Sequence, residues 1–211
     1  MLLTVVDYGV GNLRSIAKSI EKANSDNSLN YSVKVSANVN DVKKSDKIVL
    51  PGQGSFKACK NGIDNIKGLQ EELNESVLIK KKPIYGICAG MQLFATVGYE
   101  EEKTSGLNWI PGEVIKLNLG TSNLKIPHMG WNELKIESNS KVFEDKINKD
   151  HAYFIHSYEF IPKDKKNISI TTNYGKDVIA AVSSGNIFGS QFHPEKSQTT
   201  GIKILTNFLN L

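Results

Sequence analysis

The chain has 211 residues with 26 basic and 22 acidic side chains, a net charge of +4, 8% aromatic residues and two cysteines. A chain of this length buries enough surface to fold without a disulfide or metal staple, so we expect a single domain over residues 1–211. The weak, scattered positive charge gives no nucleic-acid signature, and no apolar run approaches the ~18 residues of a membrane span.

The start of the chain and its cysteine content predict a cytoplasmic protein. Residues 1–12, MLLTVVDYGVGN, lack the basic segment of a signal peptide and have the pattern of a first buried strand. Two cysteines without an export signal indicate free thiols in a reducing compartment. There is no C-x-x-C motif and no spacing typical of metal ligands, so we expect neither a metal nor a cofactor.

The first half of the chain alternates apolar runs with amphipathic segments. An apolar run at residues 2–6 predicts a buried strand, and apolar residues at helical spacing over residues 13–20 predict a helix that Asn12 would cap. Further expected elements are strands at 31–35, 47–50 and 84–87, one or two helices over 57–80 interrupted at Gly68, and a helix at 90–97. This order predicts a mostly parallel sheet with helices on both faces.

The second half is typical of strands joined by short turns. The strands are expected at 114–119, 131–136, 152–160, 168–172, 178–182 and 187–192, and a helix at 200–209 follows them. Several of these strands should be antiparallel, because the turns between them are short. The predicted fold class is therefore α/β, with a mostly parallel central sheet, flanking helices and an antiparallel extension in the second half.

The stretch IYGICAGMQ places Cys88 between two glycines, where a strand becomes a helix. A sharp strand-to-helix turn exposes the side chain at its tip and requires small residues two positions away, which Gly86 and Gly90 provide. The helix N-terminus would favour a thiolate, and the Ala89 N–H could stabilise an oxyanion. A buried cysteine in a glycine-rich turn is the simpler interpretation, but the spacing also suits a nucleophile. Cys59 lacks flanking glycines and is expected to be structural.

A base for this cysteine is expected in GSQFHPEKS, which contains one of the four histidines. Pro194 keeps His193 extended, and side chains two positions apart in an extended segment point the same way, so His193 and Glu195 can face one site. Glu195 would orient the imidazole and stabilise its cationic form. Alone, the motif fits a strand-ending turn with a surface carboxylate. Together with the cysteine elbow, it favours a Cys-His-Glu triad.

Six motifs in order carry a family resemblance. They are DYGVGNLRS, LPGQGSF, GICAGMQ, IPHMGWN, HAYFIHSY and QFHPEKS, and the resemblance extends over residues 4–209. Together they resemble the class I glutamine amidotransferases, and within that family the glutaminase subunits of imidazole glycerol phosphate synthase, an enzyme of histidine biosynthesis. The resemblance implies a flavodoxin-like α/β fold and hydrolysis of L-glutamine without a cofactor.

The resemblance also implies roles for individual residues. Cys88 would attack the side-chain amide carbon of glutamine, His193 would be the general base and acid, and Glu195 would be its partner. The other implied positions are oxyanion donors in the backbone of Ala89 and of Gly52 or Gln53, and glutamine-binding positions at Gly54, Gln92, Glu100, His156, Ser157 and Tyr158. Gln53 replaces the small aliphatic residue and Ala89 the leucine that are usual in the family. Both donors are backbone groups, so neither change argues against activity.

Two of these assignments stay open at the level of the sequence. Glu101 and Glu102 follow Glu100 directly, so the carboxylate that faces the amino group of the substrate is not fixed. His156 could be a satisfied strand histidine, with only the backbone of its segment lining the pocket.

The resemblance implies a heterodimer with a (βα)8-barrel cyclase subunit, which would receive the ammonia. Asn12, Trp131 and Lys196 match positions at the docking face of the family. Their simpler interpretations are a helix cap, a core aromatic residue and a solvated lysine. No nucleic acid or membrane is implied as a partner.

Three other functions compete with this one. A paralogous glutaminase subunit would supply ammonia to another synthase, such as a sugar amidotransferase. A cysteine peptidase with a related elbow is disfavoured by the His-x-Glu motif near the C-terminal end. A scaffold without activity is disfavoured by the presence of Cys88, His193 and Glu195 together.

Overall fold

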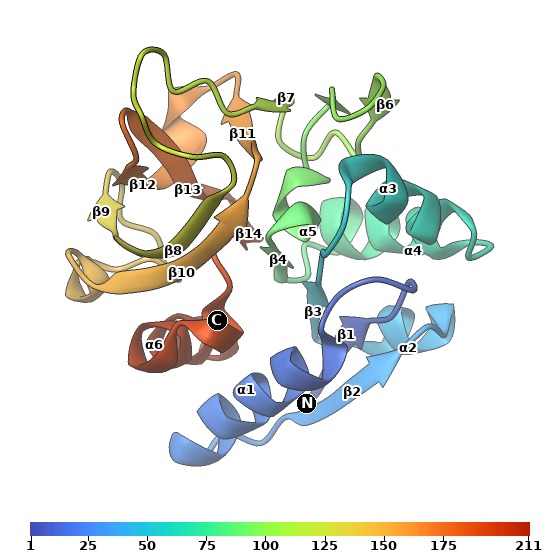
Figure 1. Cartoon of the computed structure of the whole chain (residues 1–211). Coiled ribbons are helices and arrows are strands. Elements are labelled where there is room, and N and C mark those ends of the chain that lie inside the picture. Colours follow the sequence, from blue (N-terminus) through green and yellow to red (C-terminus); the bar gives the residue numbers. More distant parts are fainter.

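An eight-stranded sheet forms the centre of the protein (Figure 1). The computed structural model describes all 211 residues apart from the side chain of residue 145. The strands of this sheet are β1 (Leu2–Val6), β2 (Ser32–Ser36), β3 (Lys47–Leu50), β4 (Ile84–Ile87), β9 (Lys135–Ile136), β12 (Ile168–Asn173), β13 (Asp177–Ser184) and β14 (Ile187–Ser190). Their order is β2-β1-β3-β4-β14-β13-β12-β9, in which the first five are parallel and the last three pair antiparallel. The parallel part has the flavodoxin-like order, and the predicted fold class is confirmed.

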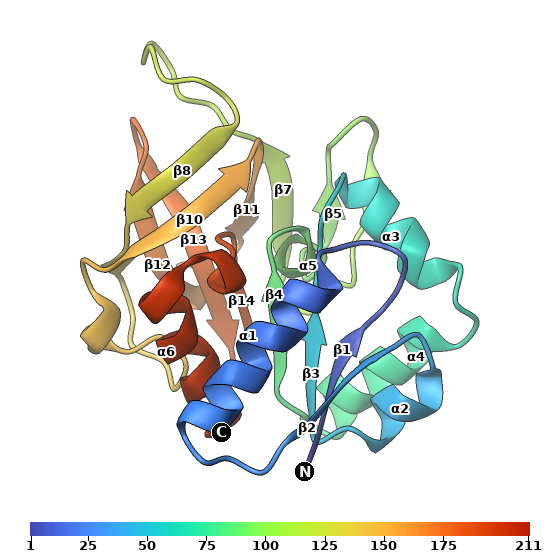
Figure 2. The same ribbon diagram turned by 60° about the horizontal axis from the view of Figure 1, so that its bottom comes forward.

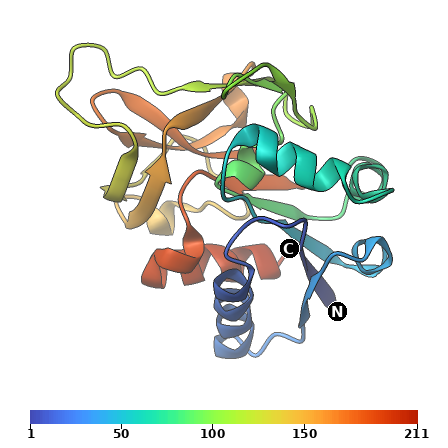
Figure 3. The same ribbon diagram turned by 45° about the vertical axis from the view of Figure 1, so that its right-hand side comes forward.

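Helices cover both faces of this sheet. They are α1 (Leu13–Asp26), α2 (Val39–Lys44), α3 (Phe56–Asp64), α4 (Leu69–Asn74), α5 (Ala89–Gln92) and α6 (Gln198–Leu209), with a π-helical turn at Glu75–Ile79 and 3₁₀ turns at Asp145–Ile147, Lys165–Asn167 and Pro194–Lys196. α1 and α6 lie on one face, and α3 and α4 on the other (Figure 2, Figure 3). Ile16, Ile20 and Phe208 belong to one buried apolar cluster, and Phe56 and Leu73 to a second. None of the described helices is long and apolar enough to cross a membrane.

Two smaller sheets lie beside the main one. β10 (His151–His156) pairs antiparallel with β8 (His128–Glu133), and β11 (Tyr158–Pro162) joins β7 (Gly112–Lys116), β5 (Val97–Gly98) and β6 (Thr104–Ser105). Figure 2 shows β8 and β10 as a two-stranded ribbon next to the main sheet. The strand expected at 152–160 is therefore two strands, which separate at Ser157 because the chain leaves one small sheet for the other.

Several expectations for the local structure were wrong or incomplete, and the strand expected at 131–136 is divided between β8 and β9, which belong to different sheets. The helix expected at 90–97 ends at Gln92. The carbonyl of Leu93 accepts a hydrogen bond from the Leu107 N–H (2.7 Å), so a distant loop uses the acceptor that the Val97 N–H would need in a longer helix. The side chain of Asn12 forms no capping hydrogen bond and is exposed. α2, β5 and β6 were not predicted, since the first is short and polar and the other two have two residues each.

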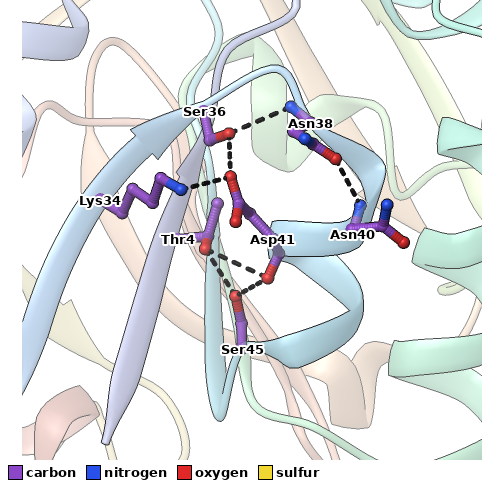
Figure 4. Close-up of polar contacts among 7 residues, drawn as sticks. All are labelled: Thr4, Lys34, Ser36, Asn38, Asn40, Asp41 and Ser45. Carbon is purple, nitrogen blue, oxygen red and sulfur yellow. Dashed lines mark hydrogen bonds and ion pairs between the residues drawn. The ribbon is translucent and has the colours of Figure 1, made fainter.

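Polar side chains hold the short helix α2 against β1 and β2 (Figure 4). Asp41 Oδ2 pairs with Lys34 Nζ (2.7 Å) and accepts a hydrogen bond from Ser36 Oγ. Ser45 Oγ bonds to Thr4 Oγ1 (2.6 Å). The contacts with Lys34 and Ser36 lower the pKa of Asp41. The helix also buries Val42, with Val39 packed beside it, but two valines in six residues are too few for hydrophobic periodicity to mark a helix.

Candidate active site

Cys88 lies at a sharp turn between β4 and α5. Its backbone has φ +54° and ψ −115°, a conformation rare for a residue other than glycine. Its N–H donates to the carbonyl of Ser190 on the neighbouring strand β14 (2.7 Å). Ala89 is the first residue of α5, so its N–H has no acceptor within the helix. The glycine spacing predicts such an elbow, and the structure contains it.

The glycines of the elbow are required by close backbone contacts. A Cβ atom on Gly90 would lie 2.1 Å from Leu50 O, and one on Gly86 would lie 2.8 Å from the backbone of Met91. On the facing loop, a Cβ atom on Gly52 would lie 2.0 Å from Gly90 N. Contacts this short leave no room for any side chain. The loop after β3 and the elbow therefore fit together only with glycine at these positions.

We expect Gly90→Ala to lower the free energy of unfolding by about 1–3 kcal/mol, because the new methyl group must push the Leu50 carbonyl away. Thermal and chemical denaturation would measure the loss. Gly90→Val is the matched comparison, because a larger side chain at the same position must push the carbonyl further and should lose more stability than Gly90→Ala. Equal losses in both variants would contradict the role of close contact.

His193 follows β14 and is paired with Glu195. Nδ1 of the ring lies 2.7 Å from Oε1, and the two side chains are 8% and 1% exposed. His193 is extended, as Pro194 predicts, but Glu195 lies in the 3₁₀ turn Pro194–Lys196, so a turn rather than an extended segment brings the carboxylate to the ring. Burial lowers the pKa of His193, but its contacts with Cys88 and Glu195 outweigh burial and raise the pKa to about 9. The imidazole is therefore cationic at neutral pH.

The elbow and the histidine line one cavity of about 310 Å³, at the carboxyl ends of β3, β4 and β14. Ligands bind at this edge in open α/β sheets. The cavity is lined by nearly all of the predicted oxyanion, glutamine-binding and catalytic positions: Gly52, Gln53, Gly54, Cys88, Ala89, Gln92, Glu100, His156, Ser157, Tyr158 and His193, together with Lys196. Glu195 is not part of the lining and reaches the site through His193.

Gln191 is a residue of this site that the sequence analysis did not single out. It is fully buried, and its Nε2 lies 3.5 Å from Cys88 Sγ. Its Oε1 accepts a hydrogen bond from Gln92 Nε2 (2.9 Å), which also donates to the carbonyl of Tyr158 (3.0 Å). Both N–H groups of Gln92 are thus used, and its Oε1 is left to accept a hydrogen bond from a ligand. The motif QFHPEKS contains Gln191, but only the tertiary structure places its amide against the sulfur.

Of the three consecutive glutamates, Glu100 is the one that lines the cavity. Its Oε2 accepts a hydrogen bond from the Phe56 N–H at the start of α3 (2.8 Å), and burial raises its pKa. Glu101 and Glu102 are exposed, and Glu102 pairs with Lys57 (2.9 Å). Among the three glutamates that the sequence left as alternatives, Glu100 is therefore the best placed to face a ligand in the cavity.

The loop after β3 is anchored from below by Tyr8, whose Oη donates to the carbonyl of Pro51. Gly54 in this loop has φ +116°, a conformation that favours glycine. The fully buried Cys59 lies under the loop, and burial raises its pKa to about 12. The nearby backbone of Gln53 favours the charged form of this thiol and partly opposes the shift in its pKa.

Comparison with known proteins identifies the family. The family described as glutamine amidotransferase class-I matches residues 4–211. The chain belongs to the class I glutamine amidotransferases. It is 50% identical over 211 residues to the imidazole glycerol phosphate synthase subunit HisH of Pelagibacter ubique, covering 100% of both chains. It is 41% identical over 212 residues to HisH of Brucella suis, covering 99% of this chain and 98% of that one. The resemblance inferred from the motifs is confirmed.

Solved structures of other amidotransferases share the fold at low sequence identity. A crystal structure of a glutamine amidotransferase matches with a TM-score of 0.71 and 15% identity, covering 99% of both chains. The crystal structure of a glutamine amidotransferase from Thermotoga maritima matches with a TM-score of 0.61 and 16% identity, covering 92% of this chain and 76% of that one. At this identity the likeness shows the fold alone.

The outer face of the β8–β10 ribbon in this amidotransferase is apolar and exposed. Met129 and Ile155 are cross-strand partners, as are Trp131 and Tyr153, and Trp131 is 49% exposed, so the interpretation of Trp131 as a core residue is wrong. Lys196 Nζ lies 5.6 Å from the Tyr153 ring, which Trp131 contacts edge-on. Two of the three predicted interface residues thus lie together beside the cavity, while Asn12 is exposed at the start of α1.

Proposed function

We propose that this chain hydrolyses L-glutamine to glutamate and ammonia and passes the ammonia to a (βα)8-barrel cyclase subunit of imidazole glycerol phosphate synthase. The cyclase would use it to make imidazole glycerol phosphate and aminoimidazole carboxamide ribotide in histidine biosynthesis. One observation carries the proposal. Cys88 at a strained elbow shares a cavity with a His193–Glu195 pair, in a chain 50% identical to a HisH subunit over its whole length.

The geometry supports a thioester mechanism. The cationic His193 holds the proton that Cys88 has given up, and the sulfur attacks the amide carbon of glutamine. The oxyanion that forms accepts hydrogen bonds from the Ala89 N–H and from a second N–H in the loop at Gly52 and Gln53. His193 then gives its proton to the departing nitrogen, which leaves as ammonia. In the second half, His193 activates a water that hydrolyses the glutamyl thioester, and glutamate leaves.

The exposed apolar face of β8 and β10 supports docking of a partner beside the cavity. Met129, Trp131 and Ile155 are 57%, 49% and 37% exposed, and Ile155 also lines the cavity. Contiguous exposed apolar side chains often mark interaction sites. A partner seated here would cover the cavity, so ammonia could pass to it without meeting bulk water. Asn12 and Lys196 would lie at the same interface.

Co-purification with the cyclase of the same organism, followed by a glutaminase assay, tests this function. We expect a one-to-one complex that releases glutamate and forms imidazole glycerol phosphate from glutamine. A complex formed instead with another ammonia-using synthase, such as a sugar amidotransferase, would support the paralogous function. No glutamine turnover with either partner would refute the enzymatic proposal.

We expect the isolated chain to be weakly active and to be strongly stimulated by the cyclase and its nucleotide ligand. The second oxyanion donor would be the N–H of the Gln53 peptide, which we expect to rotate toward the oxyanion only when the cyclase binds. The flanking glycines Gly52 and Gly54 let it rotate at little cost. One oxyanion donor contributes a factor on the order of 10²–10³ in rate, and titration of the chain with the cyclase would measure the stimulation.

Gln53→Pro removes this N–H and should lose most of the stimulated rate while the complex still forms. Gln53→Val is the matched control, because it keeps the N–H and restores the aliphatic side chain usual in the family. If Gln53→Pro is stimulated as fully as Gln53→Val, the donor is the Gly52 N–H or another group. Full activity of the isolated wild-type chain would remove the basis for control by the partner.

A further inference from the structure

Two buried histidines outside the triad face each other across the β8–β10 ribbon. His128 and His156 are cross-strand partners, 2% and 6% exposed, and His128 Nδ1 lies 3.0 Å from His156 Nε2. The His128 ring also stacks on the rings of Phe154 and Tyr174, at centroid distances of 4.6 and 4.1 Å. His156 lines the glutamine cavity, whereas His128 does not.

The outer partners of the pair fix which nitrogen carries each proton. His156 Nδ1 lies 2.9 Å from the carbonyl of Tyr158, which can only accept, so Nδ1 carries the proton and Nε2 is an acceptor. His128 must then donate to it from Nδ1, and its own Nε2 accepts from Asn132 Nδ2 (3.2 Å). Asn132 cannot turn over, because its Nδ2 also donates to Asn173 O (2.9 Å) and its Oδ1 accepts from the Glu133 N–H (2.8 Å). From Asn132 through His128 and His156 to the Tyr158 carbonyl, each hydrogen bond is donated in the direction of the cavity.

The surroundings keep both rings neutral. Burial lowers the pKa of His128 to about 4 and that of His156 to about 3. For His156 the bond to the Tyr158 carbonyl opposes burial, while the nearby His128 and His193 lower the pKa further. His193, in the same site, shifts the other way. Titratable groups whose environments push their pKa values apart usually have different roles. Here His128 and His156 are neutral hydrogen-bonding groups, whereas His193 is cationic.

The histidine pair and the side-chain amide of Gln92, which faces the cavity, are linked through one shared acceptor. The Tyr158 carbonyl accepts from His156 and also from Gln92 Nε2 (3.0 Å), and Gln92 Nε2 donates further to Gln191 Oε1 (2.9 Å). We propose that His128 is a positioning residue: through His156 and the Tyr158 carbonyl, it fixes the orientation in which Gln92 presents its Oε1 to the glutamine cavity. The inference rests on the proposed glutaminase function and deepens it.

The reverse tautomer of His156 would disturb this arrangement. Its Nδ1 lone pair would face the lone pairs of the Tyr158 carbonyl, and the two would repel. The carbonyl would then move, and Gln92 would lose the acceptor that holds its Nε2. With the amide turned over, two N–H donors would meet the donor groups of the substrate, its amide and ammonium. Without the His128 N–H, the buried Nε2 of His156 has no donor, and the ring gains a reason to adopt this reverse tautomer. Loss of His128 should therefore weaken glutamine binding more than it slows the chemistry.

Two variants of His128 separate its donor from its packing. His128→Phe keeps an aromatic ring against Phe154 and Tyr174 but removes the donor to His156. His128→Asn loses the stacking but places an amide N–H near the position of Nδ1. We expect His128→Phe in the complex with cyclase to raise the glutamine KM about tenfold, the effect of one lost hydrogen bond, with little change in kcat. His128→Asn should keep most of the wild-type KM. An unchanged KM in His128→Phe, or equal losses in both variants, would overturn the proposal.

Nitrogen NMR of the wild-type chain reports the tautomer and charge of each histidine ring directly. It needs neither enzymatic activity nor a folded variant. We expect both rings in the Nδ1–H tautomer and uncharged down to about pH 5, since their pKa values are about 4 and 3. An Nε2–H tautomer at His156 would overturn the inference whatever the kinetics show. A wild-type complex without glutamine turnover would instead refute the proposed function, and the tautomers would still test the positioning arrangement.

Discussion

Replacing Cys88 with alanine should abolish glutamine-dependent synthesis by the complex, with a loss of at least about 10⁴-fold. The thiol is the nucleophile in the proposed mechanism, and no other described sulfur lies in the cavity. Synthesis from added ammonium salts should survive in the same variant, because the cyclase can take ammonia from solution. Parallel assays with glutamine and with ammonium chloride would measure both rates. Loss of the ammonium-dependent rate as well would point to a damaged complex rather than a missing nucleophile.

Chemical labelling gives an independent check within the wild-type chain. A glutamine analogue with an electrophilic carbon should modify Cys88 and leave Cys59 untouched. Cys59 is fully buried and its pKa is raised to about 12 by burial, so almost none of it is thiolate at neutral pH. Peptide mapping by mass spectrometry would locate the label. Modification of Cys59 in the folded chain would overturn the assignment of the nucleophile.

The features that the sequence predicted well are local ones. The cysteine elbow depends on glycines two positions away, and His193 and Glu195 are two positions apart, so each pattern is complete within a few residues. The strands β1, β3, β4 and β14 of the parallel sheet were equally visible, because each is a short run that the sheet buries almost completely. The edge strand β2 is largely exposed and was visible only from its alternating valines. The pairing of His193 with Glu195 was predicted, but the geometry behind the prediction was wrong. The prediction assumed an extended segment, whereas a 3₁₀ turn brings the carboxylate to the ring.

The features that escaped prediction depend on residues far apart in the chain. Gln191 reaches Cys88 across 103 positions, and His128 reaches His156 across 28. Neither pair has a spacing that marks it in advance, although both residues stand inside motifs that were singled out. The early end of α5 has the same cause, because the Leu107 N–H takes the Leu93 carbonyl that would have continued the helix. Side-chain amides and neutral histidines carry no periodic signal, so only the folded structure shows where their donors point.

His193→Asn should reduce glutaminase activity of the complex nearly as far as loss of Cys88, while Glu195→Gln should cost less. His193 moves a proton in every step, so no step of the mechanism runs without it. Glu195 touches only His193 in the proposed site, through the 2.7 Å bond to Nδ1. Its neutral isostere keeps the shape of the side chain but not the charge. Steady-state assays at saturating cyclase would compare the two losses, and equal rates for wild type and His193→Asn would refute the triad.

The pH profile separates the roles of the two residues. Burial lowers the pKa of His193, but Cys88 and Glu195 together raise it to about 9. Because the raised pKa belongs to a base, the ring is protonated below pH 9 and loses its proton above it. We therefore expect wild-type activity to fall on the alkaline side near pH 9, when no proton remains for the departing ammonia. Glu195→Gln removes one of the two residues that raise the pKa of His193, so the alkaline limb of the pH–activity profile should move to lower pH. A limb that stays near pH 9 in Glu195→Gln would mean that the carboxylate orients the ring without tuning its charge.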